Sequence, residues 1–157
     1  MDEPSFMDMA LAEARAAAAR DEVPVGAVLV DPQGRVLARA GNRPLELADP
    51  TAHAEILAIR EAAKGLGRPR LDGCALYVTL EPCPMCAQAI ALAHLGRLVF
   101  AAYDPKGGGV EHGPRIFDQP TCHHRPEWVG GVRESAAATL LREFFQARRI
   151  DSAPPLG

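Results

Sequence analysis

Two cysteines three residues apart, set between two short apolar segments, constrain the fold of this 157-residue chain more than any other feature. Residues 75–80 and 98–102 are apolar and of strand length, and residues 84–95 between them have helical spacing. A strand, a helix and a second strand in this order form a β-α-β unit with parallel strands. Cys83 and Cys86 then lie in the opening turn of the helix, with both sulfur atoms on one face.

His53 and Glu55 precede these cysteines and complete a candidate metal site. One imidazole and two thiolates bind Zn²⁺ and leave its fourth tetrahedral position open to water. A helix N-terminus and the metal both lower a thiol pKa, so Cys83 and Cys86 are expected to bind as thiolates. Two thiolates neutralise the charge of the ion and weaken it as a Lewis acid, so a general base is needed. We therefore predict one zinc ion per chain on His53, Cys83 and Cys86, with Glu55 as the catalytic acid and base.

Other cysteine and histidine residues leave alternatives open. A Cys-x-x-Cys pair also occurs in structural zinc sites and in redox pairs. A closed structural site needs a fourth ligand, which Cys74, Cys122, His123 or His124 could supply. Residues 122–124 could also belong to a second metal site, but structural or substrate-side contacts are the favoured interpretation in an irregular segment. Cys74 is expected to be a small apolar residue at a strand edge.

Length and composition indicate one domain over residues 1–157, with residues 151–157 expected to be a disordered tail. A chain of this size buries about 70% of its unfolded surface, which is enough for a core without disulfides. No apolar run of about 20 residues is present, so no membrane span is expected. Residues 1–4 lack the pattern of a signal peptide, so we expect a cytoplasmic protein with reduced thiols. The net charge of −3 argues against a general nucleic-acid binder but permits local recognition of one folded RNA.

Three further helices and a hairpin are predicted around the β-α-β unit. Residues 6–20 have helical spacing, and Ser5 with Asp8 is predicted to form a capping box before them. The turn sequence of residues 31–34 separates two β-branched runs and predicts a hairpin. A helix is expected from Asp49 through Lys64, and another over the apolar stripe between Ala137 and Phe145. Residues 103–133 are expected to hold at most short elements.

The order His-x-Glu followed by Pro-Cys-x-x-Cys matches the signature of zinc-dependent nucleobase deaminases, a class that includes adenine deaminases, and the interpretation as a deaminase rests on this match. From about Phe6 to Ile150 the chain resembles the bacterial tRNA-specific adenosine deaminases. The metal motif is shared by the wider cytidine-deaminase-like superfamily. Residues 78–80 before Glu-Pro-Cys, the loop of residues 104–107 and the basic end of the last helix are typical of the tRNA branch. The resemblance lies in residues 22–28, 41–44, 49–56, 76–83, 85–87, 104–108, 144–145 and 148–149.

This resemblance implies a three-layer α/β/α fold of the cytidine-deaminase-like type, with a mixed five-stranded sheet. It implies a homodimer in which loops of the partner complete each active site. The implied reaction converts adenosine to inosine at the wobble position of a tRNA anticodon stem-loop, with arginine tRNA of anticodon ACG as the expected substrate. By position, the implied substrate-binding residues are Asn42 and the backbone of Ala54 at the flipped nucleotide, Asp104 and Lys106 at the anticodon, and Phe144, Arg148 and Arg149 along the RNA.

One departure and two alternative functions accompany the resemblance. His94 stands where many relatives carry an arginine, which leaves dimer packing and RNA contacts open in that region. A free nucleobase or nucleoside deaminase of the guanine or cytosine type would use the same metal site and the same Glu55. A non-catalytic subunit would keep zinc for structure alone, but the presence of Glu55 argues against it. Residues 104–149 distinguish the first alternative, because an enzyme for free bases needs no RNA-binding loop or basic helix end.

Overall fold

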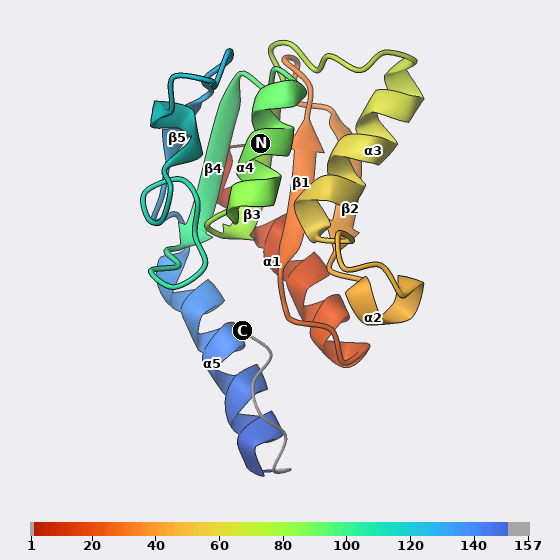
Figure 1. Ribbon diagram of the computed structural model, residues 1–157. Coiled ribbons are helices and arrows are strands. Elements are labelled where there is room, and N and C mark those ends of the chain that lie inside the picture. Colours follow the sequence, from red (N-terminus) through yellow and green to blue (C-terminus); the bar gives the residue numbers. More distant parts are fainter. Residues whose placement is uncertain (1, 151–157) are drawn as a thin grey trace.

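A mixed five-stranded sheet forms the centre of the computed structural model, which describes residues 2–150 and the side chains of residues 2–148 (Figure 1). The strand order is β2-β1-β3-β4-β5. β1 pairs antiparallel with both β2 and β3, whereas β3, β4 and β5 are parallel. The predicted hairpin and β-α-β unit are thereby confirmed. The strands are β1 (Gly26–Val30), β2 (Val36–Gly41), β3 (Ala75–Leu80), β4 (Arg97–Ala102) and β5 (Glu127–Val129).

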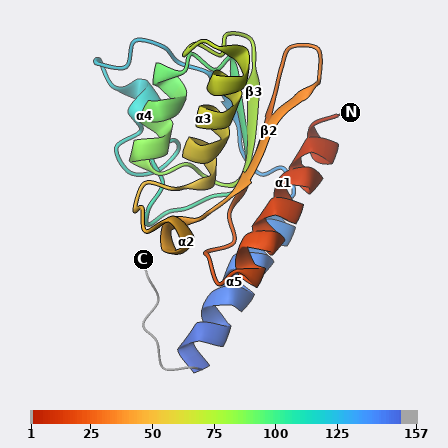
Figure 2. The same ribbon diagram turned by 90° about the vertical axis from the view of Figure 1, so that its right-hand side faces the viewer.

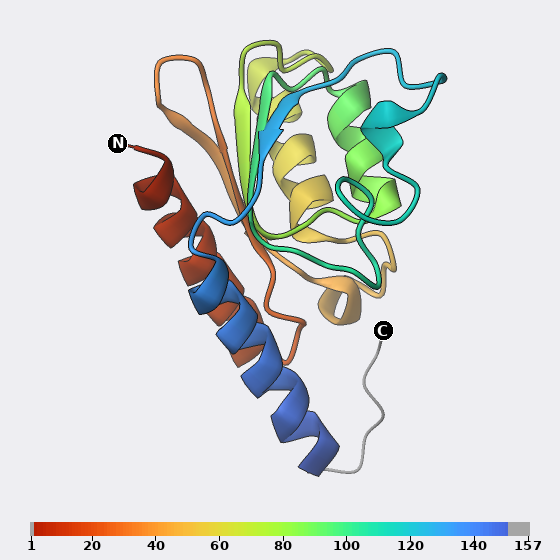
Figure 3. The same ribbon diagram turned by 90° about the vertical axis from the view of Figure 1, so that its left-hand side faces the viewer.

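Helices cover both faces of the sheet, as Figures 2 and 3 show from opposite sides. α1 (Glu3–Ala19) and α5 (Glu134–Ile150) lie on one face, and α3 (Ala54–Leu66) and α4 (Pro84–Leu92) lie on the other. The short helix α2 (Pro44–Leu47) and the 3₁₀ helix η1 (Ile116–Asp118) lie in connections. The expected three-layer α/β/α fold is confirmed. Over residues 2–150, no helix combines the length and the apolar character that a membrane crossing requires.

The core is divided by the sheet into two apolar clusters, because successive strand residues face opposite sides. On β3, Leu76 and Val78 join the cluster beneath α3 and α4, whereas Tyr77 joins the cluster beneath α1 and α5.

The helix α1 is unusually close to the sheet at Gly26. A Cβ atom there would lie 2.0 Å from the carbonyl oxygen of Ala10. A glycine is therefore required for α1 to pack directly against β1.

The directions of the strands bring three connecting segments to the same end of the sheet. β2 and β3 are both antiparallel to β1 and so run the same way, and β4 is parallel to β3. The segments that follow β2, β3 and β4 therefore leave the sheet at the same end of the strands. Asn42 follows β2, Glu81 follows β3, and Asp104 follows β4 after one intervening residue. The candidate site lies at this end of the sheet.

Two predicted helix starts and one helix end are wrong. Asp2, not Ser5, caps α1, and its Oδ1 accepts a hydrogen bond of 3.0 Å from the backbone N–H of Ser5. The predicted helix from Asp49 begins only at Ala54, because the Asp49 carboxylate accepts hydrogen bonds from the backbone and hydroxyl of Thr51 and forms a turn. α4 ends at Leu92, so His94, expected within that helix, follows it with a left-handed φ of 56°. The expected disordered tail, residues 151–157, lies outside the described residues.

Candidate active site

The three predicted metal ligands meet at the N-termini of two helices. His53 is the N-cap residue of α3, Cys83 is the N-cap residue of α4, and Cys86 lies in the first turn of α4. The Nδ1 atom of His53 lies 3.6 Å from Sγ of Cys83 and 3.5 Å from Sγ of Cys86. Among the residues that the structure describes, these form the one group of three side chains arranged to hold a metal ion. The sequence prediction that joined them is borne out by this geometry.

The spacing of these donor atoms fits zinc. Tetrahedral geometry with Zn–N near 2.0 Å and Zn–S near 2.3 Å places the nitrogen and sulfur atoms about 3.5 Å apart. The observed separations of 3.5 and 3.6 Å agree with that value. Three protein ligands also leave a fourth position open, which is the arrangement of a catalytic and not a structural zinc site.

The pKa values of the two thiols are shifted in opposite directions. A hydrogen bond from Cys86, with the neighbouring His53, lowers the pKa of Cys83 to about 4. The same contact with Cys83 raises the pKa of Cys86, and burial adds to the shift. The pair therefore carries one negative charge near neutral pH. Metal binding through both sulfur atoms displaces the remaining proton, so affinity for the ion depends on pH.

Glu55 lies in the first turn of α3 beside this group and is 4% exposed. Burial raises the pKa of its carboxyl to about 7, and the negative charge of Cys83 contributes in the same direction. A carboxyl group with a pKa near the working pH can both accept and return a proton. The position and chemistry of Glu55 therefore suit the general acid and base that the sequence predicts.

Asn42 and Ala54, predicted separately as nucleotide contacts, lie together next to His53. The side-chain Oδ1 of Asn42 accepts a hydrogen bond of 2.8 Å from the backbone N–H of Ala54, and both residues are buried. This bond satisfies one of the free N–H groups at the start of α3. The residue that follows β2 is thereby fixed to the start of α3, next to His53.

Asp104 and Lys106 lie in the loop that follows β4. The Oδ1 atom of Asp104 accepts hydrogen bonds from the backbone N–H groups of Lys106 and Gly107, at 3.2 and 2.9 Å. Lys106 is exposed at the tip of this turn. Further along the loop, the N–H of Gly109 donates to the carbonyl oxygen of Pro82, next to the ligand Cys83. The loop is therefore joined to the metal-binding turn.

The predicted RNA-binding residues belong to α5, which begins on the face of the sheet opposite α3 and α4 and extends beyond the sheet toward its C-terminal end (Figure 3). Phe144 is 8% exposed, and the guanidinium carbon of Arg148 lies 3.4 Å from the centroid of its ring. Arg148 also donates a hydrogen bond of 3.0 Å to the carboxylate of Asp21. Arg149 belongs to α5, but its side chain lies outside the described part of the chain.

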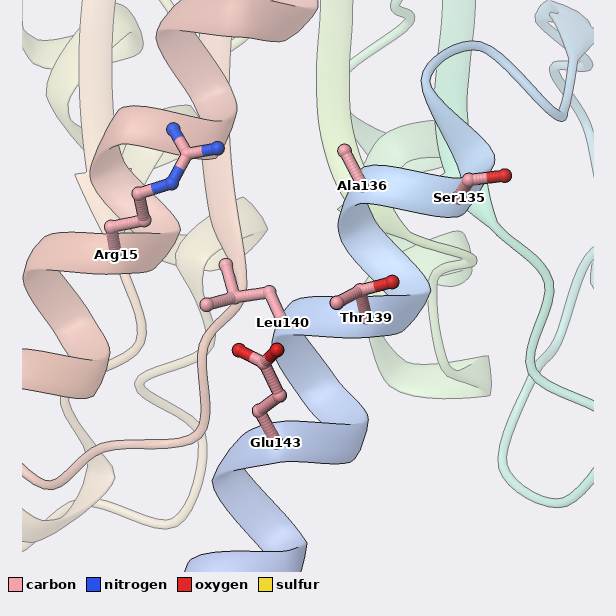
Figure 4. Close-up of a pocket in the computed structure, with 6 residues that line it drawn as sticks. All are labelled: Arg15, Ser135, Ala136, Thr139, Leu140 and Glu143. Atoms are coloured by element: carbon pink, nitrogen blue, oxygen red, sulfur yellow. The ribbon is translucent and has the colours of Figure 1, made fainter.

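A groove between α1 and α5 is a separate feature of that same face (Figure 4). It has a volume of about 340 Å³ and runs between Arg15 on α1 and Leu140 and Glu143 on α5. The metal ligands are at the start of α3 and α4, on the opposite face of the sheet. This groove is therefore not part of the candidate active site.

Comparison with known proteins identifies the family. The profile described as the cytidine and deoxycytidylate deaminase zinc-binding region matches residues 1–102. The tRNA-specific adenosine deaminase of Agrobacterium fabrum strain C58 is 60% identical over 146 residues, which are 93% of this chain and 95% of that protein. The chain belongs to the tRNA-specific adenosine deaminases.

Solved structures support this membership of the tRNA-specific adenosine deaminases. One, described as a tRNA:A34 deaminase that edits A to I at the wobble position, superposes with a TM-score of 0.86 at 60% identity. That similarity covers 87% of this chain and 99% of the other. The guanine deaminase of Nitrosomonas europaea superposes with a TM-score of 0.78 at 27% identity, over 90% of this chain and 83% of the other. The fold is thus shared with a deaminase of a free base, as the predicted alternative requires.

Sequence reasoning gave no role to two buried carboxylates of this deaminase family member, Glu81 and Glu22. Glu22 is 2% exposed and accepts hydrogen bonds from the backbone N–H groups of Leu45 and Glu46, so it caps α2. Glu81 is also 2% exposed, and its carboxylate accepts hydrogen bonds from the loop that follows β4. For Glu81, the sequence did contain a signal, which is an acidic residue directly after the apolar run of residues 75–80.

The segment of residues 122–124 does not assemble a second group of metal ligands among the described residues. The thiol of Cys122 donates to the carbonyl oxygen of His124 at 3.1 Å, and Nε2 of His124 lies 2.7 Å from the carbonyl oxygen of Leu95. These contacts agree with the favoured structural interpretation for this tRNA-specific adenosine deaminase family member. Cys74 is buried beside β3, as expected of a small apolar residue.

Proposed function

We propose that this chain converts adenosine to inosine at the wobble position of a tRNA anticodon, with arginine tRNA of anticodon ACG as its substrate. The observation that carries the proposal is a zinc-compatible group of His53, Cys83 and Cys86 with the buried carboxyl of Glu55 beside it. The 60% identity to a tRNA-specific adenosine deaminase supports the choice of substrate. Zinc would be held by His53, Cys83 and Cys86.

Hydrolysis at this site requires a water molecule, an acid and a base. A zinc ion supplies Lewis-acid chemistry that makes water a nucleophile near neutral pH. Glu55 takes a proton from the water while the water oxygen adds to the carbon that bears the exocyclic amine. Glu55 then gives this proton to the adjacent ring nitrogen. Glu55 then passes the second proton of the water to the amine, so the C–N bond breaks and ammonia leaves while the C=O bond forms. One water is consumed and one ammonia released for each inosine.

The target base must leave its stack to reach the metal group, and this is easiest in a single-stranded anticodon loop. Asn42 and Ala54 lie beside His53, where a flipped base would enter. The exposed Lys106 lies on a loop joined to the metal-binding turn, which suits contact with neighbouring nucleotides. We assign the flipped nucleotide to Asn42 and Ala54, the anticodon to Asp104 and Lys106, and the RNA backbone to Phe144, Arg148 and Arg149.

We further propose that the active unit is a cytoplasmic homodimer in which loops of the partner complete each active site. The side chain of Leu92, at the end of the helix that carries two metal ligands, is 69% exposed. We expect this leucine to be part of the contact with the second copy. Light scattering on the zinc-loaded protein should give the mass of two chains, and the mass of one chain would exclude the dimer.

The decisive experiment measures inosine formation on an arginine tRNA transcript with anticodon ACG. The purified zinc-loaded protein is incubated with the transcript, and inosine is read as A-to-G after reverse transcription. Glu55→Ala is the matched inactive variant. Conversion at the wobble position that disappears in this variant would support the reaction, the substrate and the role of Glu55 together.

Free guanine, cytosine, cytidine and adenosine are tested in parallel by ammonia release. This arm addresses the second candidate, a free-base deaminase, which the structural similarity to a guanine deaminase favours. Ammonia from a free base with no conversion of tRNA would keep the proposed chemistry and overturn the proposed substrate. No product from any substrate would overturn the assignment as an active deaminase.

A further inference from the structure

We propose that the buried carboxylate of Glu81 is a positioning group that holds the loop from Asp104 to His112 in one place against the metal-binding turn. Through this loop Glu81 sets where Lys106 meets the substrate. The part of the inference that concerns RNA rests on the proposed function. The part that concerns the loop rests on contacts within the chain.

Five hydrogen bonds converge on this one carboxylate, whose side chain is fully buried. Its Oε1 accepts from the backbone N–H of Asp104 at 3.0 Å and from Nδ1 of His112 at 2.8 Å. Its Oε2 accepts from the backbone N–H groups of Val110, Glu111 and His112, at 3.2, 3.0 and 3.0 Å. The loop is therefore held near both of its ends by a residue outside it.

The loop also fits closely around the carboxylate. A Cβ atom on Gly108 would lie 2.3 Å from Oε2 of Glu81 and 2.6 Å from the carbonyl oxygen of Asp104. The next residue, Gly109, donates its N–H to the carbonyl oxygen of Pro82 at 2.8 Å. The chain thus passes between the carboxylate and the turn that carries Cys83, and only glycine fits at residue 108.

The exposed tip of the loop takes its position from these contacts. Lys106 and Gly107 are tied by their backbone N–H groups to the side chain of Asp104. The backbone N–H of Asp104 is in turn tied to Glu81. A displacement of the Glu81 carboxylate would therefore move the turn that carries Lys106.

A carboxylate is the group that this arrangement requires. All five hydrogen bonds at Glu81 are accepted by its two carboxylate oxygens, four of them from backbone N–H groups. An ionised carboxylate only accepts hydrogen bonds, whereas a glutamine has one oxygen and an NH₂ group that donates. Glu81→Gln would keep the shape of the side chain and turn the NH₂ group toward N–H donors of the loop.

The test uses the two lysines of the chain, Lys64 and Lys106. Digestion by a lysine-specific protease of the zinc-loaded full chain reports on the loop at Lys106 and on α3 at Lys64. We expect Glu81→Gln to raise the cleavage rate after Lys106 at least about tenfold, because one hydrogen bond to a charged group changes an equilibrium by about that factor or more. Cleavage after Lys64 should not change.

Glu111→Gln is the matched control. Its side chain lies on the same loop and pairs at the surface with Arg115, and the substitution leaves its backbone N–H to Glu81 intact. This variant should be cleaved like the wild type. A wild-type cleavage rate after Lys106 in Glu81→Gln would overturn the proposal.

The same variants are then assayed on an anticodon stem-loop, with zinc measured per chain. A positioning role predicts that Glu81→Gln raises KM about tenfold or more, changes kcat much less, and leaves zinc content unchanged. An unchanged KM would overturn the substrate part of the inference. Failure of the wild type to deaminate RNA would overturn the proposed function, while the protease comparison would still decide whether Glu81 holds the loop.

His112→Ala keeps the inference testable if Glu81→Gln does not fold or loses zinc. It removes one side-chain hydrogen bond to Oε1 and leaves the carboxylate and the four backbone contacts in place. Faster cleavage after Lys106 than in the wild type, with unchanged cleavage after Lys64, would support the proposal. A wild-type rate in that case would overturn it. His123→Ala, on an exposed histidine outside the loop, is the control.

Discussion

The side-chain oxygen of Asn42 is hydrogen-bonded to the backbone N–H of Ala54 at 2.8 Å. Both residues are proposed to contact the target nucleotide, yet in the structure they also contact each other. The oxygen of the Asn42 amide is occupied at the start of α3, so its NH₂ group is the end left for a base. The two functions of this side chain can therefore be separated by substitution.

Asn42→Asp should keep the acceptor for Ala54 and lose the NH₂ donor. We expect zinc content and melting temperature near those of the wild type, with kcat/KM for the anticodon stem-loop reduced at least about tenfold, the loss that follows when a hydrogen-bond donor to the substrate is removed. Asn42→Ala should lose both contacts and also lower the melting temperature. Wild-type kcat/KM in Asn42→Asp would show that the amide does not contact the base.

Removal of the guanidinium of Arg148 should weaken RNA binding without affecting zinc. Arg148 stacks on Phe144 and pairs with Asp21, whose side chain is 86% exposed. Such an exposed ion pair contributes little to stability, so a phosphate can replace Asp21 as the partner. Arg148→Ala should reduce the slope of log affinity against log salt by about one. Arg142→Ala is the control on the same helix, and an equal slope in wild type and Arg148→Ala would exclude the contact with phosphate.

Loss of a metal ligand should reduce both zinc content and stability. His53→Ala and Cys86→Ala each remove one of three protein ligands from a site between the starts of α3 and α4. Binding of the ion contributes to the folding free energy, so both variants should melt at lower temperature than the zinc-loaded wild type. A chelator should lower the melting temperature of the wild type and have little effect on the variants. Full zinc content in either variant would show that the assigned ligand does not bind the ion.

Gly26 and Gly65 offer a matched pair for the packing of α1. A Cβ atom at Gly26 would meet the backbone of Ala10 at 2.0 Å, whereas a Cβ atom at Gly65 would have no atom within 4 Å apart from its chain neighbours and the backbone of its own helix. Gly26→Ala should destabilise the fold by at least about 1–3 kcal/mol through overpacking. Gly65→Ala, within α3, should be neutral or stabilising by up to about 1 kcal/mol, because alanine favours a helix. Urea unfolding measures both, and similar values for the two variants would contradict the close approach of α1 to β1.

The hairpin turn between β1 and β2 should contribute pH-dependent stability through Asp31. Hydrogen bonds from the backbone and side chain of Arg35 and from the backbone of Gln33 hold the pKa of Asp31 below its usual 3.8. A pKa lowered by folding means that the stabilisation is complete above the unfolded value and is lost as the pH falls through the folded value. Wild type should therefore exceed Asp31→Asn in urea midpoint at pH 6, with a gap that narrows below pH 3.8. A constant gap would contradict the role of the charge.

Local patterns predicted the parts of the fold that local forces determine. The short apolar run of Ala75–Leu80, the turn at residues 31–34 and the apolar stripe of the last helix each predicted the element that forms. The metal group was predicted because its ligand types and spacing are themselves the chemical requirement. Helix starts were less accurate, since Asp49 could serve equally as a helix cap or as the turn acceptor that it becomes.

Other features depend on partners that lie far along the chain. α2 has four residues and is capped by Glu22, which a local pattern does not connect to it. Glu81 obtains its role from N–H donors that arrive 23 to 31 residues later. His53 has an extended backbone before α3, with φ −72° and ψ 152°, where the sequence predicted a helical turn. These roles follow from the three-dimensional arrangement and not from any single segment.

Asn42, Glu81 and Asp104 lie in segments that leave the sheet at one end of the strands. The turn of residues 32–34 lies at the opposite end of β1 and β2. That turn is exposed and contains none of the predicted metal ligands. The amino-acid sequence of the turn can therefore change without disturbing the candidate site at the other end of the strands. A library with insertions between Gln33 and Gly34 should retain folded, zinc-loaded members, whereas a single-codon deletion between Leu80 and Cys83 should abolish them. Labels and fused domains belong at the hairpin end.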